Sequence, residues 1–338
     1  MQPLLKRPTA ADTKFTTITK ITKTKLFVFV IFVTFVIFVT RPSAVTPQTT
    51  GKAMALTFDD LPKSSGLEDI EGARRTTDSI LRVLKAHKAP AIGFVNEGKL
   101  YSGATMVPDR ATLLKSWVDA GIPLSNHTYS HIDINNVPLE KYQDDVVRGE
   151  RTYTRLQRGT GVTERWFRHP FTHTGPTAEI KAGLERFLVG RGYRIAPFTI
   201  ENSDWMFSAV YAKAKTAGDD PLATRTRDAY LDYSDAMVEW CETLAKEDFG
   251  RDIPQILVIH ANDLHTDALD ALLTRLERRG YRWVTLGEAM KDTAYATTDE
   301  YVGKFGPSWL HRWRVAKKLP PRMTDEPDPP KWILDLAK

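Results

Sequence analysis

The chain has 338 residues, 42% of them hydrophobic and 26% charged, which excludes a disordered chain, a collagen-like chain and a disulfide-stapled miniprotein. Its single cysteine, Cys241, excludes an internal disulfide framework and a cysteine-rich zinc site. The net charge is +5, but the first 44 residues hold seven Lys and Arg against one Asp, which leaves 40 basic and 41 acidic residues in the remainder. The remainder is therefore expected to be nearly neutral and to offer no basic face to a nucleic acid.

Residues 1–45 are predicted to be a basic leader, and residues 46–51 a linker. Six basic residues precede an apolar run at 26–39, and small residues follow it, which is the layout of a secretory signal peptide. Pro42 fits the small-residue cleavage rule poorly, so an uncleaved membrane anchor stays open, and a buried strand is a further alternative. In both export readings the chain is periplasmic, extracellular or tethered to the outer side of the cytoplasmic membrane, which it touches only through the leader.

Segments typical of strands and helices alternate over residues 52–292. The predicted strands are 53–58, 91–95, 166–167, 193–200, 256–259 and 281–286. The predicted helices are 73–88, 109–120, 139–157, 178–189, 223–246 and 267–279, with a short one after the last strand. Alternation of this kind implies a parallel sheet, and about seven units without a glycine-rich phosphate loop favour a single α/β barrel over a dinucleotide fold.

The tail at 293–338 shows no such alternation. It is proline-rich and charged at 320–330, so it is predicted to be irregular. Trp309, Trp313 and Trp332 are expected to pack it on the exterior of the barrel.

Two adjacent carboxylates, Asp59 and Asp60, stand where the first strand ends. Barrels of this kind place their active sites at that face of the sheet. The alternative is a turn cap beside a solvated aspartate.

Two histidines, His127 and His131, stand between the predicted strands at 91–95 and 166–167. Their spacing of four residues lets both rings converge on one ion. With Asp60 they supply two nitrogens and one oxygen, a set that suits zinc or a neighbouring divalent ion. Asp59 is then free to act as a base toward a water activated by the metal. The alternative is a pair of partly exposed loop histidines.

Three weaker motifs follow. Arg168 directly follows the predicted strand at 166–167 and could orient a carboxylate, although a single arginine more often forms a surface salt bridge. Asp204 stands in Ser203-Asp204-Trp205, and His260 ends an apolar strand. A histidine held by an aspartate can be a general acid, although a single histidine is more often structural.

In their order and spacing these five motifs resemble the polysaccharide deacetylase family, also called the NodB-homology domain or carbohydrate esterase family four. The resemblance covers roughly residues 52–290. It implies an α/β fold, a distorted (β/α)7-type barrel forming a single catalytic domain. It also implies one divalent metal ion, usually zinc, bound by Asp60, His127 and His131.

The resemblance further assigns roles to individual residues. Asp59 would be the general base toward the metal water, and Arg168 would hold it in place. His260 would be the general acid for the leaving amine, with Asp204 tuning it. The metal and the backbone N–H of Phe171 would form the oxyanion site.

The chain also departs from the family pattern. Leu61 and Thr172 stand where glycine is common, and Glu201 stands where aspartate is common. These changes do not affect the three expected metal ligands, but they leave the identity of the substrate open. Trp205 is expected to contact that substrate.

The expected function is hydrolysis of an N-acetyl amide, or less often an O-acetyl ester, on an N-acetylated glycan that lies outside the cytoplasmic membrane. The alternatives are an amide hydrolase of the same fold with a non-sugar substrate and a non-catalytic glycan-binding protein. The non-catalytic alternative predicts loss of Asp59 or of a metal ligand, and all of these residues are present.

Overall fold

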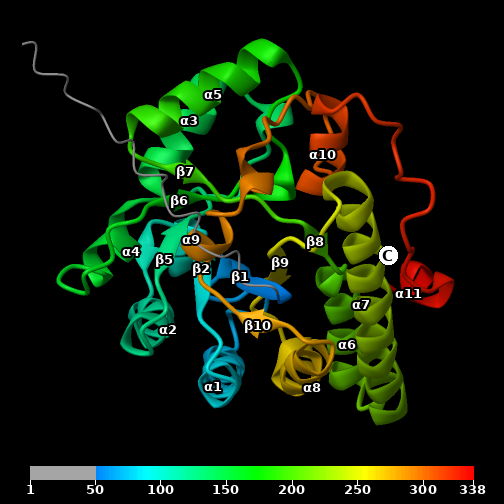
Figure 1. The fold of residues 1–338 in the computed structure, drawn as a ribbon. Helices are drawn as coiled ribbons and strands as arrows, with labels where there is room; N and C mark the ends of the chain where they lie inside the picture. The colour runs from blue at the N-terminus through cyan, green and yellow to red at the C-terminus, as the bar shows by residue number, and fades with distance from the viewer. Residues whose placement is uncertain (1–50) are drawn as a thin grey trace, which may run out of the picture. The chain divides into compact units, whose positions relative to one another are not determined.

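A sheet of eight strands, all paired in parallel, organises the part of the chain that the computed structural model describes, residues 51–338 (Figure 1). The strand order is β7–β6–β5–β2–β1–β9–β8, and β10 also pairs with β1. The strands are β1 (Ala53–Leu61), β2 (Ala91–Val95), β5 (Leu124–Asn126), β6 (Trp166–Phe167), β7 (Arg194–Ile195), β8 (Ile200–Glu201), β9 (Gln255–His260) and β10 (Arg282–Trp283). A separate antiparallel pair joins β3 (Tyr101–Ser102) to β4 (Thr105–Met106).

The sheet curls into an open barrel, because none of the pairings within residues 51–338 joins β7 to β8. The main helices lie around its outside (Figure 1). They are α1 (Ile70–Ala86), α2 (Pro108–Asp119), α3 (Leu139–Arg148), α4 (Arg151–Leu156), α5 (Ala178–Gly190), α6 (Asp204–Ala217), α7 (Asp220–Phe249), α8 (Leu264–Arg278) and α9 (Leu286–Ala289). The predicted α/β barrel is thus confirmed.

Strand β1 lies at the centre of the sheet. Its residues from Ala53 to Asp59 are all buried, and it pairs with β2, β9 and β10. A parallel strand covered on both faces reads as a continuous apolar run, which is why this segment was recognisable in the sequence. The paired end of this strand therefore fixes the positions of Asp59 and Asp60.

Several predicted boundaries are wrong. The strand at 193–200 is two short strands, β7 and β8, separated by an irregular stretch at 196–199. The helix at 139–157 is broken at Gly149, where a Cβ would lie 2.7 Å from the carbonyl carbon of Thr128. Only glycine permits this close approach, so the chain bends there instead of continuing as one helix. The final strand is also shorter than predicted, because only Arg282 and Trp283 pair with β1.

The tail is more ordered than predicted. It contains two α-helices, α10 (Trp309–Ala316) and α11 (Lys331–Leu336), and a 3-10 turn, η4 (Thr293–Ala296), so the expectation of an irregular segment is wrong for these stretches. Trp309 and Trp313 are buried, and Trp332 is half-buried against the core. The Trp313 ring lies 5.4 Å from Phe249 of α7, between ring centroids.

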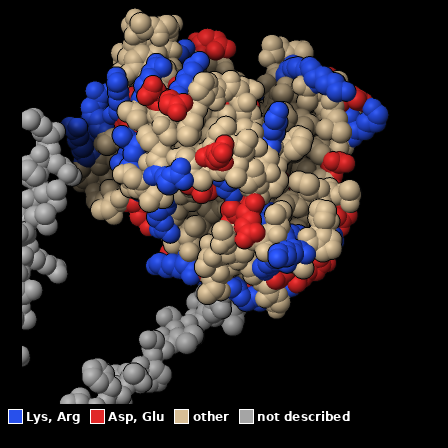
Figure 2. Space-filling model, turned by 90° about the horizontal axis from the view of Figure 1, so that it is seen from above, with Lys and Arg blue, Asp and Glu red and all other residues tan. Residues whose placement is uncertain are grey.

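Residues 1–50, on which the predicted leader falls, lie outside the described residues. Among the helices that are described, none has the length and apolar character needed to cross a bilayer. Figure 2 views the molecule from above and shows acidic and basic side chains interspersed on that face.

Candidate active site

Polar side chains from several strands meet at the carboxyl-terminal edge of the sheet. Asp59 lies in register with His260 across the β1–β9 pair. His127 and Arg168 directly follow β5 and β6, which are neighbours in the sheet. Because parallel strands end at one edge, residues far apart in the sequence become neighbours there.

Asp60, His127 and His131 each offer one ligand atom, and the three atoms lie within 4.8 Å of one another. Asp60 Oδ1 is 3.6 Å from His127 Nε2 and 3.4 Å from His131 Nε2. This oxygen is buried and has no hydrogen-bond partner among the described residues. His127 Nδ1 lies 2.8 Å from the Arg168 carbonyl oxygen, which assigns the ring proton to Nδ1 and leaves Nε2 free as a ligand. The residues present therefore fit a divalent ion.

The protonation states of these side chains also suit a metal. Burial lowers the pKa of His127 and of His131 to about 4, so both rings are neutral near pH 7. Burial alone would raise the pKa of Asp60, but Lys99 and the nearby histidines hold it well below its usual range. Metal binding therefore requires no proton release from these three side chains at neutral pH.

Lys99 is a site residue that sequence reasoning missed. It lies in the 3-10 turn η1 (Glu97–Leu100), and its Nζ is 3.2 Å from Asp60 Oδ2. The same ammonium donates to the backbone carbonyls of Asp60, Lys63 and Ser64. Lys99 thus fixes one oxygen of Asp60 and leaves the other facing the histidines.

The loop that carries His131 is held by α3. Asp145 accepts hydrogen bonds from the backbone N–H groups of Tyr129 and Ser130, at 3.1 and 2.9 Å, and from the Ser130 hydroxyl at 2.8 Å. His131 itself has a φ of 54°, in the left-handed region that non-glycine residues rarely occupy. Asp60 and Phe171 share this conformation, with φ of 67° and 54°. Backbone of this kind is retained where the surrounding fold imposes it, commonly at functional sites.

Asp59 lies beside the candidate ligands but is held by a different residue. Its Oδ2 is 3.5 Å from Arg168 Nη1, and its Oδ1 is buried without a hydrogen-bond partner in the described chain. Arg168 is itself buried and donates to the Thr57 hydroxyl at 3.0 Å and to the Pro197 carbonyl at 3.3 Å. Burial raises the pKa of Asp59 against the opposing charge of Arg168. The structure thus places Arg168 where it orients Asp59.

Asp204, which is buried, and His260, which is half-buried, form a hydrogen-bonded pair at the end of β9. His260 Nδ1 is 2.7 Å from Asp204 Oδ1, and the His260 backbone N–H donates to Oδ2 at 2.8 Å. Asn262 donates to the same oxygen at 2.7 Å. Burial would lower the pKa of His260, but the Asp204 carboxylate raises it to about 10. His260 is therefore protonated at neutral pH.

Phe171 and Trp205 lie at the pocket mouth. Their exposed fractions are 51% and 54%, high for large aromatic side chains. The Phe171 ring is 4.5 Å from the His131 ring, between centroids. Both residues line the pocket, and exposed aromatic rings are suited to contact with a sugar face.

The pocket has a volume of about 640 Å³ and joins these residues to the C-terminal tail. It is lined by Asp59, Asp60, His127, His131 and His260. Arg168 and Asp204 do not line it but contact Asp59 and His260. The tail contributes Gly306, Pro307, Ser308, His311, Met323 and Glu326. The sequence carried no signal for this contribution, because the tail has no periodic pattern and no motif.

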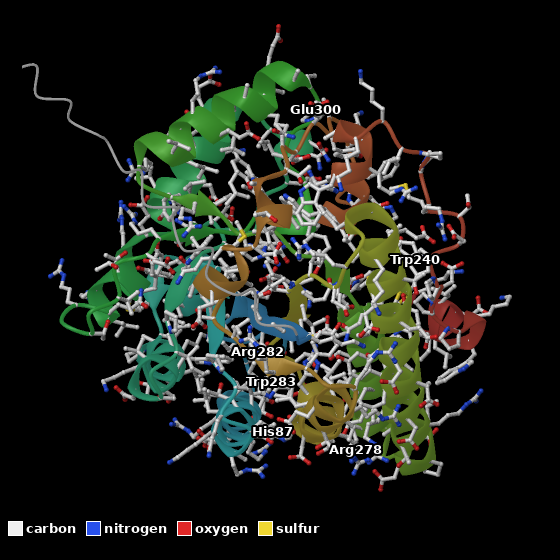
Figure 3. The ribbon with its side chains drawn as sticks, in the orientation of Figure 1. His87, Trp240, Arg278, Arg282, Trp283 and Glu300 are labelled. Atoms are coloured by element: carbon white, nitrogen blue, oxygen red, sulfur yellow. The ribbon has the colours of Figure 1, made fainter. Side chains whose placement is uncertain are left out.

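A larger cavity, of about 1200 Å³, lies at the opposite end of the sheet, near the amino ends of β2 and β10. Among the described residues, the group of side chains that could hold a metal ion lines the smaller pocket and not this cavity. Figure 3 labels His87 and Trp283 at that opposite end, where both side chains contact Glu277 of α8 at 2.9 and 2.8 Å.

Comparison with known proteins bears on the family of the chain. The family model described as polysaccharide deacetylase matches residues 46–184. The peptidoglycan-N-acetylglucosamine deacetylase of Bacillus cereus (strain ATCC 14579) is 23% identical over 239 residues, which cover 69% of this chain and 66% of that protein. The chain thus spans just under two thirds of the length of this relative.

Two solved structures are also similar. One is BA3943, a CE4 family pseudoenzyme from Bacillus anthracis, with a TM-score of 0.47 and 19% identity over 71% of this chain and 66% of that one. The other is the peptidoglycan deacetylase PdaC from Bacillus subtilis, with a TM-score of 0.46 and 20% identity over 71% of this chain and 92% of that one. The family match over residues 46–184 bears out the resemblance to polysaccharide deacetylases for that part of the chain.

Proposed function

We propose that this protein is a metal-dependent hydrolase that removes N-acetyl groups from a glycan. The observation that carries the proposal is one pocket holding three convergent ligand atoms, a buried carboxylate beside them and a protonated histidine opposite. We also propose that the protein acts outside the cytoplasmic membrane, because the leader has the layout of an export signal and glycan polymers lie there.

Asp60, His127 and His131 would hold one divalent ion, and their two nitrogens and one oxygen favour zinc. When bound, such an ion supplies Lewis acidity, which lowers the pKa of water and polarises a carbonyl group. The neutral state of both histidines and the free Oδ1 of Asp60 support this assignment.

Asp59 would act as the general base. Arg168 fixes its Oδ2, and its Oδ1 has no other partner in the described chain and is available to accept a proton. Burial raises the pKa of this carboxyl, which makes it a stronger base once ionised.

His260 would act as the general acid. Its Nδ1 proton is committed to Asp204, so Nε2 carries the proton that the leaving amine would receive. The pKa of about 10 keeps that proton in place at neutral pH. Phe171, through its backbone N–H, and Trp205 would contact the substrate.

The test is acetate release by the purified protein, with added zinc and with chelator, from peptidoglycan, chitin oligomers and acetylated xylan. We expect chelator-sensitive release from at least one substrate. Asp59→Asn should lose about 100-fold or more of kcat while it still binds zinc. His127→Ala should lose zinc, whereas the surface variant His87→Ala, far from the pocket, should behave like the wild type.

The outcomes separate the alternatives. Release from none of these glycans, with one metal bound per chain, would point to a non-sugar amide substrate. No release and no bound metal would point to a non-catalytic glycan-binding protein. Normal activity in Asp59→Asn would overturn the mechanism, because the mechanism assigns the base to this carboxylate.

A further inference from the structure

We infer that residues 299–327 of the tail form a wall of the substrate pocket that selects glycans bearing no carboxylate, either neutral or carrying a free ammonium group. The inference rests on the proposed function and deepens it by naming the substrate class. It depends on three features of the wall: its attachment to the barrel, its unpaired polar atoms and its charge.

The wall is firmly attached through Arg312. This side chain is fully buried and donates hydrogen bonds to the Thr172 carbonyl at 2.9 Å and to the Thr174 hydroxyl at 2.9 Å, both in the loop after β6. It also pairs with Asp299 at 3.1 Å, and Lys181 of α5 lies 2.9 Å from the same carboxylate. A buried charge with this many partners holds both segments in one arrangement.

A second attachment lies directly at the pocket. The Thr172 hydroxyl is 2.7 Å from the Gly306 carbonyl oxygen, and the Trp309 N–H donates to the Phe198 carbonyl at 2.9 Å. Thr172 is one of the departures from the family pattern. Its hydroxyl also lies 2.6 Å from the Phe171 carbonyl oxygen, and its contact with Gly306 links that departure to the wall.

The wall presents unsatisfied polar atoms to the pocket. Ser308 and His311 line it with exposed fractions of 8% and 6%, and neither Ser308 Oγ nor His311 Nδ1 has a hydrogen-bond partner within residues 51–338. His311 is held in place, because its Nε2 is 2.9 Å from Glu326 and its ring lies 5.3 Å from that of Trp240, which Figure 3 labels on α7. Buried groups of this kind normally have partners, and sugar hydroxyls would supply them.

The charge of the lining argues for the substrate class. Besides Asp59 and Asp60, the described lining contains the carboxylates of Glu201 and Glu326, and no Lys or Arg. Burial, then Asp204 and to a smaller extent Glu326, raise the pKa of Glu201 to about 7, so Glu201 is partly neutral at pH 7 and Glu326 carries the larger share of this charge. A second carboxylate brought by the substrate would meet these two without a fixed counter-ion. An ammonium group would be attracted to them.

The positive charges of the pocket lie at the end where the acetyl group would react. His260 and the proposed metal would face the acetyl group, so they are not available to balance a charge elsewhere on the substrate. The exposed ring of Trp205, which also lines the pocket, can stack on a sugar or lie beneath an ammonium group. A volume of about 640 Å³ has room for a short glycan or the end of a longer one.

The experiment compares kcat/KM for three substrates: a neutral N-acetylglucosamine oligomer, the same oligomer partly deacetylated, and an oligomer of alternating N-acetylglucosamine and glucuronate. For the wild type we expect the carboxylated oligomer to be at least about fivefold poorer than the other two. Glu326→Lys should remove or reverse that preference. Asp325→Lys is the matched control, since the neighbouring Asp325 undergoes the same charge change but pairs with Arg322 and does not line the pocket.

Equal kcat/KM for all three substrates in the wild type, or the same shift in both variants, would overturn the inference. Calorimetry with glucosamine and glucuronate oligomers, which carry no acetyl group, provides a readout independent of catalysis. Tighter binding of glucosamine by the wild type, lost in Glu326→Lys, would support the inference even if no acetate were released. In that case only the proposed function would have failed.

Discussion

Replacing Asp204 with Asn removes the carboxylate that keeps His260 protonated. In the wild type the pKa of His260 is raised from about 6.5 to about 10, so nearly every molecule holds the proton at pH 8. Without Asp204 the opposing effect of burial remains, against only the weaker attraction of Asp60 and Asp59, and the pKa should fall to near 6.5. At pH 8 about 3% of the rings would then be protonated, so activity that needs this proton should fall about 30-fold or more.

Two assays follow this change. The basic limb of the kcat profile should move from near pH 10 to below pH 7, and NMR of labelled histidine should report the His260 pKa without any turnover. Asp235→Asn is a matched control, because Asp235 is a carboxylate on the outer helix α7 that pairs with Arg275 at 2.7 Å. A His260 that still titrates near pH 10 in Asp204→Asn would refute the reasoning.

Three further outcomes are expected. Zinc affinity, measured by chelator competition, should change less than about twofold between pH 7.5 and 5.5, because the pKa of His127 and of His131 is about 4. A site with two ordinary histidines would lose about 100-fold in zinc affinity over the same range. A loss of that size would contradict the buried geometry. Arg312→Met should lower the free energy of unfolding by about 3 kcal/mol, and an unchanged urea midpoint would argue against a buried anchor. Gly306→Ala should cost about 1–3 kcal/mol, because the added Cβ would overlap Thr172 Oγ1; an unchanged melting temperature would show that the tail is free to move.

The parts of the site that could be predicted are those that follow central strands. β1 and β9 are continuous apolar runs, so the polar residues that end them, Asp59, Asp60 and His260, stand out in the sequence. The parallel barrel is confirmed, and the family resemblance is borne out over residues 46–184. Asp60, His127 and His131 are brought together as their spacing predicted.

The parts that could not be predicted depend on contacts between distant segments. Lys99 reaches Asp60 from a short turn that has no recognisable pattern. His311 and Glu326 lie in a proline-rich segment whose composition indicated irregular structure, and only the tertiary fold brings them to the pocket. The break at Gly149 was missed because a single glycine is tolerated in many helices.

Because the wall comes from residues 299–327, the pocket is complete only after these residues have been synthesised. Its lining runs from Asp59 to Glu326, and the contacts that close it join residues more than 100 positions apart. Contacts of such long sequence separation form late and slowly in folding. A nascent or truncated chain could present the metal ligands, all within the first 131 residues, before it had a pocket able to choose a substrate.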